Sequence, residues 1–281
     1  MKYYLTMPAQ LLSLPFVVSA LVCLYFAWEV DEGYAIYMVP FVVLLAIIYV
    51  FSPQINWWWY TRNTPKLDPR LTILLQQRMP FYQQLTLEAK KQFRDRIFLY
   101  MHANEFTPQG TDSVPEDIKL VIAASAVQLT FGQEDFLLAP FEKIIIYPKP
   151  FPSPQYPRHF HASEIYEEDG VILFSAEQLM LGFMQPNQYY NIALHEYAKV
   201  FRVNYPEKDY PKLPEDIWEK LEQISHFSRK AVTEWINLEV LPPYPVSVSH
   251  FFIFPQAFQA HLPEVYERYV KVFGQDPLRA A

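Results

Sequence analysis

The sequence predicts a membrane-anchored α+β protein, with an N-terminal two-helix transmembrane hairpin followed by a mostly α domain with a small sheet. Two long apolar runs near the N-terminus predict the hairpin, and apolar residues at helical spacing from Phe81 onward predict the helices. Two short runs rich in β-branched residues predict strands. The expected organisation is a hairpin over residues 1–56, a juxtamembrane linker over 57–80 and a folded domain over 81–281.

The predicted hairpin consists of residues 10–30 and 33–51, each close to the roughly 20 apolar residues that cross a bilayer. Three acidic residues, Glu29, Asp31 and Glu32, lie where the first run ends and before the second begins, and they favour a tight polar turn. The aromatic run 57–60 follows, and such residues are typical of the headgroup region of a membrane. The lipid bilayer is therefore an expected partner.

The charges that flank the hairpin predict its orientation. Lys2, Arg62, Lys66 and Arg70 lie outside it, whereas the connecting turn is acidic. The positive-inside rule then places both ends at the cytoplasmic face of the inner membrane, with the folded domain in the cytoplasm. A cleaved signal peptide is the alternative, but no small-residue cleavage site separates the two runs.

Composition narrows the function classes. The formal net charge is −7, which argues against a nucleic-acid partner because phosphate contacts need clustered Lys and Arg. The single cysteine, Cys23, excludes an internal disulfide and a cysteine-rich zinc site. Only six glycines are present, which argues against glycine-rich phosphate loops.

In the folded domain, Thr86 is a candidate cap for a helix that runs to Leu99, and two strands are expected at 143–147 and 170–175. The intervening stretch 151–169 has the composition of a loop or hairpin. Further helices are expected at 116–129, from near Ser175, at 191–204 and at 214–235, and residues 242–245 are expected to stop the chain before apolar segments at 246–254 and 262–270.

The helix at 191–204 carries the sequence His195-Glu196-Tyr197-Ala198-Lys199. In a working His-Glu-x-x-His helix, two histidines one turn apart bind Zn²⁺ and the glutamate polarises the attacking water. Lys199 takes the second histidine position, and a protonated lysine has no lone pair for a metal. Glu196 keeps the general-base position and His195 the first ligand position.

From about residue 79 to 277 the chain resembles the Mlc titration factor A (MtfA) family of zinc peptidases. The segments that carry the resemblance are 80–86, 122–126, 144–148, 194–198 and 266–277. The resemblance implies a zincin-like fold, zinc-dependent peptide-bond hydrolysis and, in some members, a transcriptional repressor as partner. It also implies a second histidine at the position of Lys199 and a ligand glutamate at the position of Ser249, so this chain departs from the family at two of three ligand positions.

Two readings of the motif remain open. The ammonium of Lys199 can take the place of the metal and pair with Glu196 three residues earlier, or His195, Glu196 and Lys199 can simply line a solvated cleft. His250 is a weak substitute ligand, since one residue of offset from Ser249 turns a helical side chain by about 100°. His159 and His161, with Glu164 and Glu167 nearby, form either a surface metal site or a polar loop.

The leading hypothesis is therefore a catalytically impaired peptidase homologue that needs no cofactor and binds a peptide or regulatory protein partner. The alternative is an active zinc peptidase with an altered ligand set that includes His195 and His250. A membrane protein whose cytoplasmic domain only oligomerises is a third option with little support, because the sequence shows no coiled-coil heptads.

Overall fold

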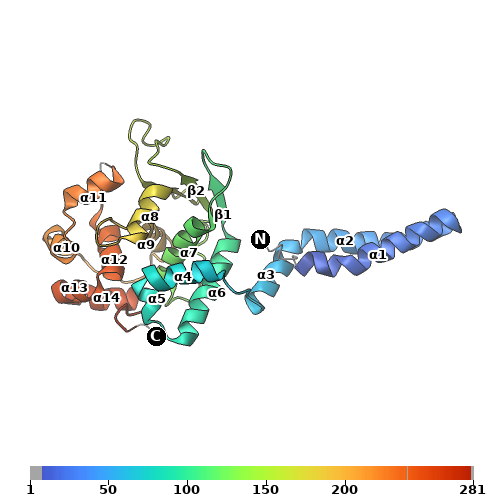
Figure 1. The fold of residues 1–281 in the computed structure, drawn as a ribbon, viewed down its shortest axis with the longest axis horizontal. Helices are drawn as coiled ribbons and strands as arrows, with labels where there is room; N and C mark the ends of the chain where they lie inside the picture. The colour runs from blue at the N-terminus through green and yellow to red at the C-terminus, as the bar shows by residue number, and fades with distance from the viewer. Residues whose placement is uncertain (1–7, 239, 280–281) are drawn as a thin grey trace. The chain divides into compact units, whose positions relative to one another are not determined.

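The computed structural model describes residues 8–238 and 240–279. The chain separates into two compact units, Met1–Pro65 and Lys66–Ala281. Helices dominate the described residues, and the second unit contains a four-stranded mixed sheet (Figure 1). The mostly helical composition with a small sheet confirms this part of the predicted fold class.

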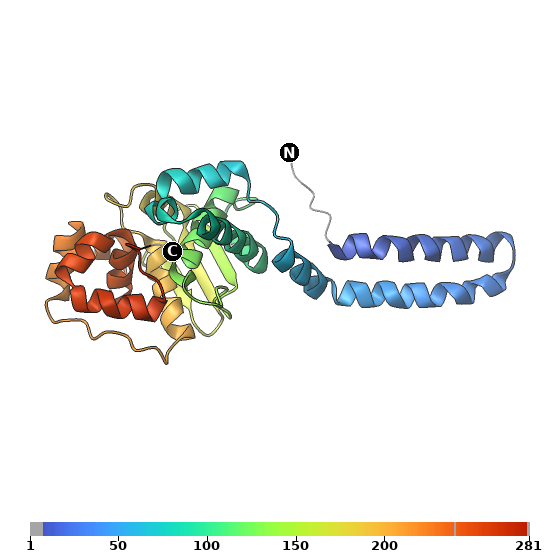
Figure 2. The ribbon, with the colours of Figure 1, turned by 90° about the horizontal axis from the view of Figure 1, so that it is seen from below.

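The first unit is a helical hairpin with a short helix after it. Its elements are α1 Pro8–Glu29, the 3₁₀ helix η1 Glu32–Met38, α2 Val39–Val50 and α3 Ser52–Arg62. Both views show α1 and α2 side by side, joined at one end by the turn (Figures 1 and 2). The Asp31 carboxylate accepts a hydrogen bond from the backbone N–H of Gly33 at 2.8 Å and so fixes that turn.

Most apolar side chains of this hairpin have no protein partner that would bury them. Leu21 and Ile47, for example, are 59% and 48% exposed. The segments Pro8–Glu29 and Glu32–Val50 are long and apolar enough to cross a membrane, judged by length and composition. Membrane crossing and its orientation stay predictions.

Residues 57–80, expected as a linker, are largely helical. They contain most of α3 and the whole of α4 Pro69–Arg78, and α5 Pro80–Gln84 follows directly. Proline at the first position of α4 and of α5 starts a helix well, since its missing N–H would be unpaired there in any case. Leu75 of α4 is completely buried in the core of the second unit.

The sheet has the strand order β1-β2-β4-β3, in which β1, β2 and β4 are parallel and β3 is an antiparallel edge strand. The predicted strands 143–147 and 170–175 are correct. The sequence did not predict β1 and β3, which have only four residues each, and β3 lies within the stretch expected as a loop or hairpin. The strands are β1 Glu105–Pro108, β2 Lys143–Tyr147, β3 Ser163–Tyr166 and β4 Val171–Ser175.

Nine further helices build the rest of the second unit within the described residues. Thr86 caps the first of them as predicted, because its hydroxyl accepts a hydrogen bond from the N–H of Ala89 at 3.2 Å. The helices are α6 Leu87–Ala103, α7 Glu116–Thr130, α8 Ala176–Met184, α9 Ile192–Asn204, α10 Ile217–Ser225, α11 Arg229–Ile236, α12 Pro243–Ile253, α13 Pro255–His261 and α14 Pro263–Phe273.

The single helix expected at 214–235 is wrong, because the chain breaks between α10 and α11. His226 adopts the left-handed conformation with φ 64°, and Ser228 caps α11 by accepting a hydrogen bond from the N–H of Ala231. Serine competes for backbone hydrogen bonds and therefore favours such helix ends over helix interiors. The expected stop at 242–245 is also wrong, since Pro243 begins α12.

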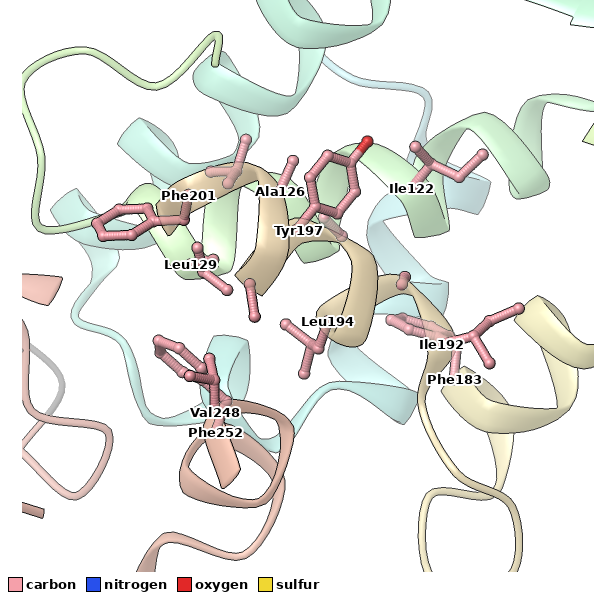
Figure 3. Close-up of a cluster of buried hydrophobic side chains, with 14 of the residues drawn as sticks. Ile122, Ala126, Leu129, Phe183, Ile192, Leu194, Tyr197, Phe201, Val248 and Phe252 are labelled. Atoms are coloured by element: carbon pink, nitrogen blue, oxygen red, sulfur yellow. The ribbon is translucent and has the colours of Figure 1, made fainter. Parts of the chain in front are cut away.

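Helix α9 lies at the centre of the core. Leu194, Tyr197 and Phe201 of α9 are completely buried. In the close-up, side chains from α7 and α12 surround this helix, among them Leu129 of α7 and Val248 of α12 (Figure 3). The motif is therefore built on a helix that is packed on several sides by the core of the unit.

Candidate functional site

The motif residues are held by a well-formed helix start. The side chain of Asn191 caps α9 by accepting a hydrogen bond from the N–H of Leu194 at 2.9 Å. His195 and Glu196 follow in the first turns and are only 2% and 0% exposed. The reading in which these residues line a solvated cleft is therefore wrong, because water does not reach the Glu196 carboxylate in this conformation.

Both carboxylate oxygens of Glu196 are occupied. Lys199 Nζ lies 2.5 Å from Glu196 Oε2 one turn along the same helix, which is the ion pair that the sequence suggested. Ser163 Oγ of strand β3 donates a hydrogen bond of 2.7 Å to Oε1. Burial raises the pKa of Glu196, but the charge of Lys199 and these hydrogen bonds outweigh it and lower the pKa overall. Glu196 is thus an ionised, fully paired carboxylate at neutral pH.

The imidazole of His195 is neutral and held by one tyrosine. Tyr190 lies directly before α9, and its hydroxyl is 2.9 Å from His195 Nδ1. Burial lowers the pKa of His195 to about 4, and the nearby charge of Lys199 lowers it further whereas Glu196 acts in the opposite sense. Ser249 of α12 also acts on the hydroxyl of Tyr190 and opposes the rise in its pKa that burial causes, so the position where the resemblance implies the third ligand lies near the first.

A glycine keeps Tyr190 in this place. A Cβ at Gly182 of α8 would lie 2.5 Å from the carbonyl oxygen of Tyr190 and 3.0 Å from Cα of Asn191. Only glycine therefore lets α8 pack this closely against the start of α9.

His250, the weak substitute ligand, has a different environment. Its Nδ1 lies 2.8 Å from the carbonyl oxygen of Val246, and its Nε2 lies 2.7 Å from Ser225 Oγ of α10. Burial lowers its pKa to about 4. Because both ring nitrogens have protein partners, His250 has no free nitrogen for a metal in this arrangement.

The residues at the three positions where the resemblance implies ligands do not fit a catalytic zinc ion, which needs three protein ligands and one open position. His195 offers one ring nitrogen, Lys199 is a cation paired with Glu196, and Ser249 carries a neutral hydroxyl. Within residues 8–238 and 240–279, no group of three His, Cys, Asp or Glu side chains is placed to hold a metal.

The second histidine cluster is divided, because His159 and Glu167 are exposed whereas His161 and Glu164 are buried. His161 is completely buried and Glu164 is 3% exposed, and His161 Nε2 lies 3.0 Å from Glu164 Oε2. A surface metal site on these four residues is therefore wrong, because the fold buries two of them and leaves the other two in solvent, and the His161–Glu164 pair attaches the stretch before β3 to that strand. Ser163 and Tyr190 are the two site residues that sequence reasoning missed, since neither belongs to a motif and both reach the site through the tertiary fold.

The fold and the site together define a metallopeptidase homologue: a His-Glu helix packed against a small mixed sheet with an antiparallel edge strand. A comparison with protein families identifies which metallopeptidase family the chain belongs to. Residues 55–204 match the glucose-regulated metallo-peptidase M90 family. This match covers just over half of the chain, and the chain belongs to this family, which confirms the resemblance drawn from the sequence.

One curated relative is an uncharacterized protein of the cyanobacterium Synechocystis. It is 24% identical over 108 residues, which is 38% of this chain and 39% of the relative. The chain thus matches about two-fifths of that protein's length.

Proposed function

We propose that the protein is a membrane-anchored, zincin-like M90 homologue in which an ion pair replaces the catalytic zinc, and that it acts by binding a peptide or protein partner. The observation that carries the proposal is the ion pair between the buried Glu196 and the partly exposed Lys199, whose charged atoms are 2.5 Å apart. The lysine supplies the positive charge that a metal would supply to this carboxylate. It cannot lower the pKa of a bound water or act as a Lewis acid.

The surroundings of Glu196 support this reading. A general base must accept a proton from water, yet the carboxylate is sealed from solvent and both its oxygens already accept hydrogen bonds. Ser249 at the third ligand position adds a neutral hydroxyl in place of a carboxylate. Each of these features reduces the hydrolytic capacity of the helix.

Strand β3 supports the binding role. It is the antiparallel edge strand of the sheet, and its Ser163 contacts the motif helix directly. An extended peptide can add to an edge strand as a further strand, but Ser163, Glu164 and Ile165 are buried here, so the segments that cover this edge would have to move first. A peptide bound there would lie beside α9, where a zincin-like enzyme would hold its substrate.

Zinc titration of the full chain in detergent tests the ion-pair replacement. After removal of metals with a chelator, we expect no tight zinc binding by the native chain or by Lys199→His alone, because Ser249 remains. The double variant Lys199→His with Ser249→Glu is expected to bind one equivalent. Circular dichroism spectra of all three proteins control for folding. Tight stoichiometric zinc on the native chain or on Lys199→His would overturn the proposal.

An active zinc peptidase with an altered ligand set is the competing function. It predicts chelator-sensitive cleavage of an unstructured protein such as casein, abolished by Glu196→Gln. Both ring nitrogens of His250 have protein hydrogen-bond partners and so are not free to bind a metal, which argues against this function.

The proposed anchoring rests on the exposed apolar side chains of α1 and α2 and on the acidic turn between them. We expect the chain to stay in the membrane pellet after alkaline extraction, with both ends on the cytoplasmic side. A protease added to sealed, right-side-out spheroplasts should then leave a tag at either end intact. Release of the chain by alkali would exclude the hairpin as an anchor.

A further inference from the structure

The second unit contains a cavity of about 370 Å³ at the N-terminal end of α9. Its walls come from α4, α5, α7, α8, the loop before α9, α12, α13 and the chain after α14, and they include four phenylalanines and four prolines. The apolar lining includes Phe81, Phe183, Pro186, Phe252, Phe254 and Pro277. None of His195, Glu196, Lys199 or Ser249 lines it, so it is distinct from the motif.

The polar residues of this cavity have unused hydrogen-bonding capacity. Gln128 of α7 lines it and is only 4% exposed, and its side-chain amide forms no hydrogen bond among the described residues although its atoms are not fully enclosed, so they face the open space of the cavity. Buried amides in native proteins are usually paired, with protein, water or ligand. Gln128 thus points to a ligand or solvent partner inside the cavity.

The charges around the cavity favour an anion. Arg78, in the last turn of α4, lines the cavity, and within the part of the chain that the structure describes its guanidinium has no ion pair or hydrogen bond. No acidic residue is part of the lining, although the whole chain carries a net charge of −7. Asn191 brings the N-terminus of α9 to the same cavity, and a helix N-terminus stabilises negative charge.

We propose that this cavity binds a small apolar carboxylic acid, such as the C-terminal end of an apolar peptide or a short free acid. The carboxylate pairs with Arg78, the polar part of the ligand hydrogen-bonds to the Gln128 amide, and the apolar body packs against the phenylalanines. The volume lies at the lower end of the range for small-molecule sites, which suits one or two residues of a peptide. One guanidinium matches one carboxylate, whereas a polyphosphate would need several cations.

Isothermal titration of the full chain in a neutral maltoside detergent tests this site with three probes. The probes are N-acetyl-leucyl-phenylalanine as free acid, the same peptide as C-terminal amide, and octanoate. We expect the peptide acid to bind at least tenfold more tightly than the amide. Binding of octanoate without the peptide acid would assign the site to free acids, and the reverse would assign it to peptide ends.

Two variants locate the binding. Arg78→Gln should weaken acid binding about tenfold and leave amide binding unchanged. Gln128→Leu should weaken the binding of both the peptide acid and the peptide amide. Arg70→Gln is the matched control, because Arg70 is an exposed arginine of the same helix α4 that does not line the cavity, and it should bind like the native chain.

The control also removes partition of the probes into micelles as an explanation, since that would affect both arginine variants equally. Equal affinity for acid and amide, equal loss in both arginine variants, or no binding of either acid would overturn the proposal. Because neither variant touches the motif, these results are independent of zinc binding and hydrolysis.

Discussion

Helix α9 connects two polar regions that differ in how their groups are satisfied. At the motif, both oxygens of Glu196 are bonded and paired with Lys199, and Nδ1 of His195 contacts Tyr190. At the cavity by the helix N-terminus, the side chains of Arg78 and Gln128 have no partner among the described residues. Internally satisfied polar groups hold a structure together, whereas unsatisfied ones remain available to a ligand.

The largest effect is expected for Lys199→Met. The substitution leaves a buried carboxylate without its cation, and breaking such a pair costs about 3 kcal/mol of unfolding free energy, toward the low end of the usual range because the Lys199 side chain is 25% exposed. Urea denaturation at pH 7 measures it. The loss should shrink toward pH 5, because the pKa of Glu196 rises without Lys199 and the buried carboxyl then becomes neutral.

Lys119→Met is the matched control. Lys119 pairs with Glu116 at the same i,i+3 spacing at 2.8 Å, but that glutamate side chain is 63% exposed. Exposed pairs contribute roughly 0–1 kcal/mol. Equal losses in the two variants would mean that Glu196 is solvated and that the motif is an ordinary surface.

The second prediction concerns the loss of stability at low pH. Burial lowers the pKa of His195 and of His250 to about 4, so the unfolded chain binds protons more readily than the folded one below about pH 6.5. Stability should fall as pH falls from about 6.5 toward 4, with each histidine costing on the order of 2 kcal/mol by pH 5.

His195→Gln separates the two contributions. Its amide can keep the hydrogen bond to Tyr190 but cannot titrate, so the pH dependence of stability between pH 7 and 5 should decrease by about half of the combined histidine effect. An unchanged pH dependence would show that His195 is exposed enough to protonate in the folded state.

Ser163→Ala is expected to have a smaller effect. The serine donates one hydrogen bond of 2.7 Å to the charged Glu196, and such a bond contributes roughly 1.5 kcal/mol. Ser113→Ala, an exposed serine of the loop before α7, should change the unfolding free energy by less than about 0.5 kcal/mol. If Ser163→Ala left the free energy of unfolding unchanged, another donor would have to replace the hydroxyl at Glu196.

The sequence could predict those parts of the site that depend on local spacing. Lys199 lies three residues after Glu196 and therefore on the same helical face, which suggested their pairing. The capping of α6 by Thr86 and the strands β2 and β4 follow from equally local signals. The burial of Glu196 depends on α7, α12 and β3, which meet α9 from distant parts of the chain.

The same dependence on the tertiary fold explains why the sequence did not predict Ser163, Tyr190 or the cavity. Ser163 belongs to a strand of four residues, which is too short to give a clear alternation, and reaches Glu196 33 residues later in the chain. Tyr190 is close in sequence to His195, but its contact with Ser249 depends on the packing of α12 against α9. The cavity is made by five separate segments, so no sequence pattern predicts it.

The smallest effect on stability is expected at the cavity, and it is the sharpest check of the contrast between the two regions. Arg78→Gln should change the unfolding free energy by less than about 0.5 kcal/mol, since the guanidinium has no partner to lose. Saturating N-acetyl-leucyl-phenylalanine acid should raise the melting temperature of the native chain and of Arg70→Gln but not that of Arg78→Gln. A destabilisation by Arg78→Gln as large as that of Lys199→Met would mean that Arg78 is a structural charge. The motif and the cavity would then both consist of structural charges, and the argument for a ligand in the cavity would be lost.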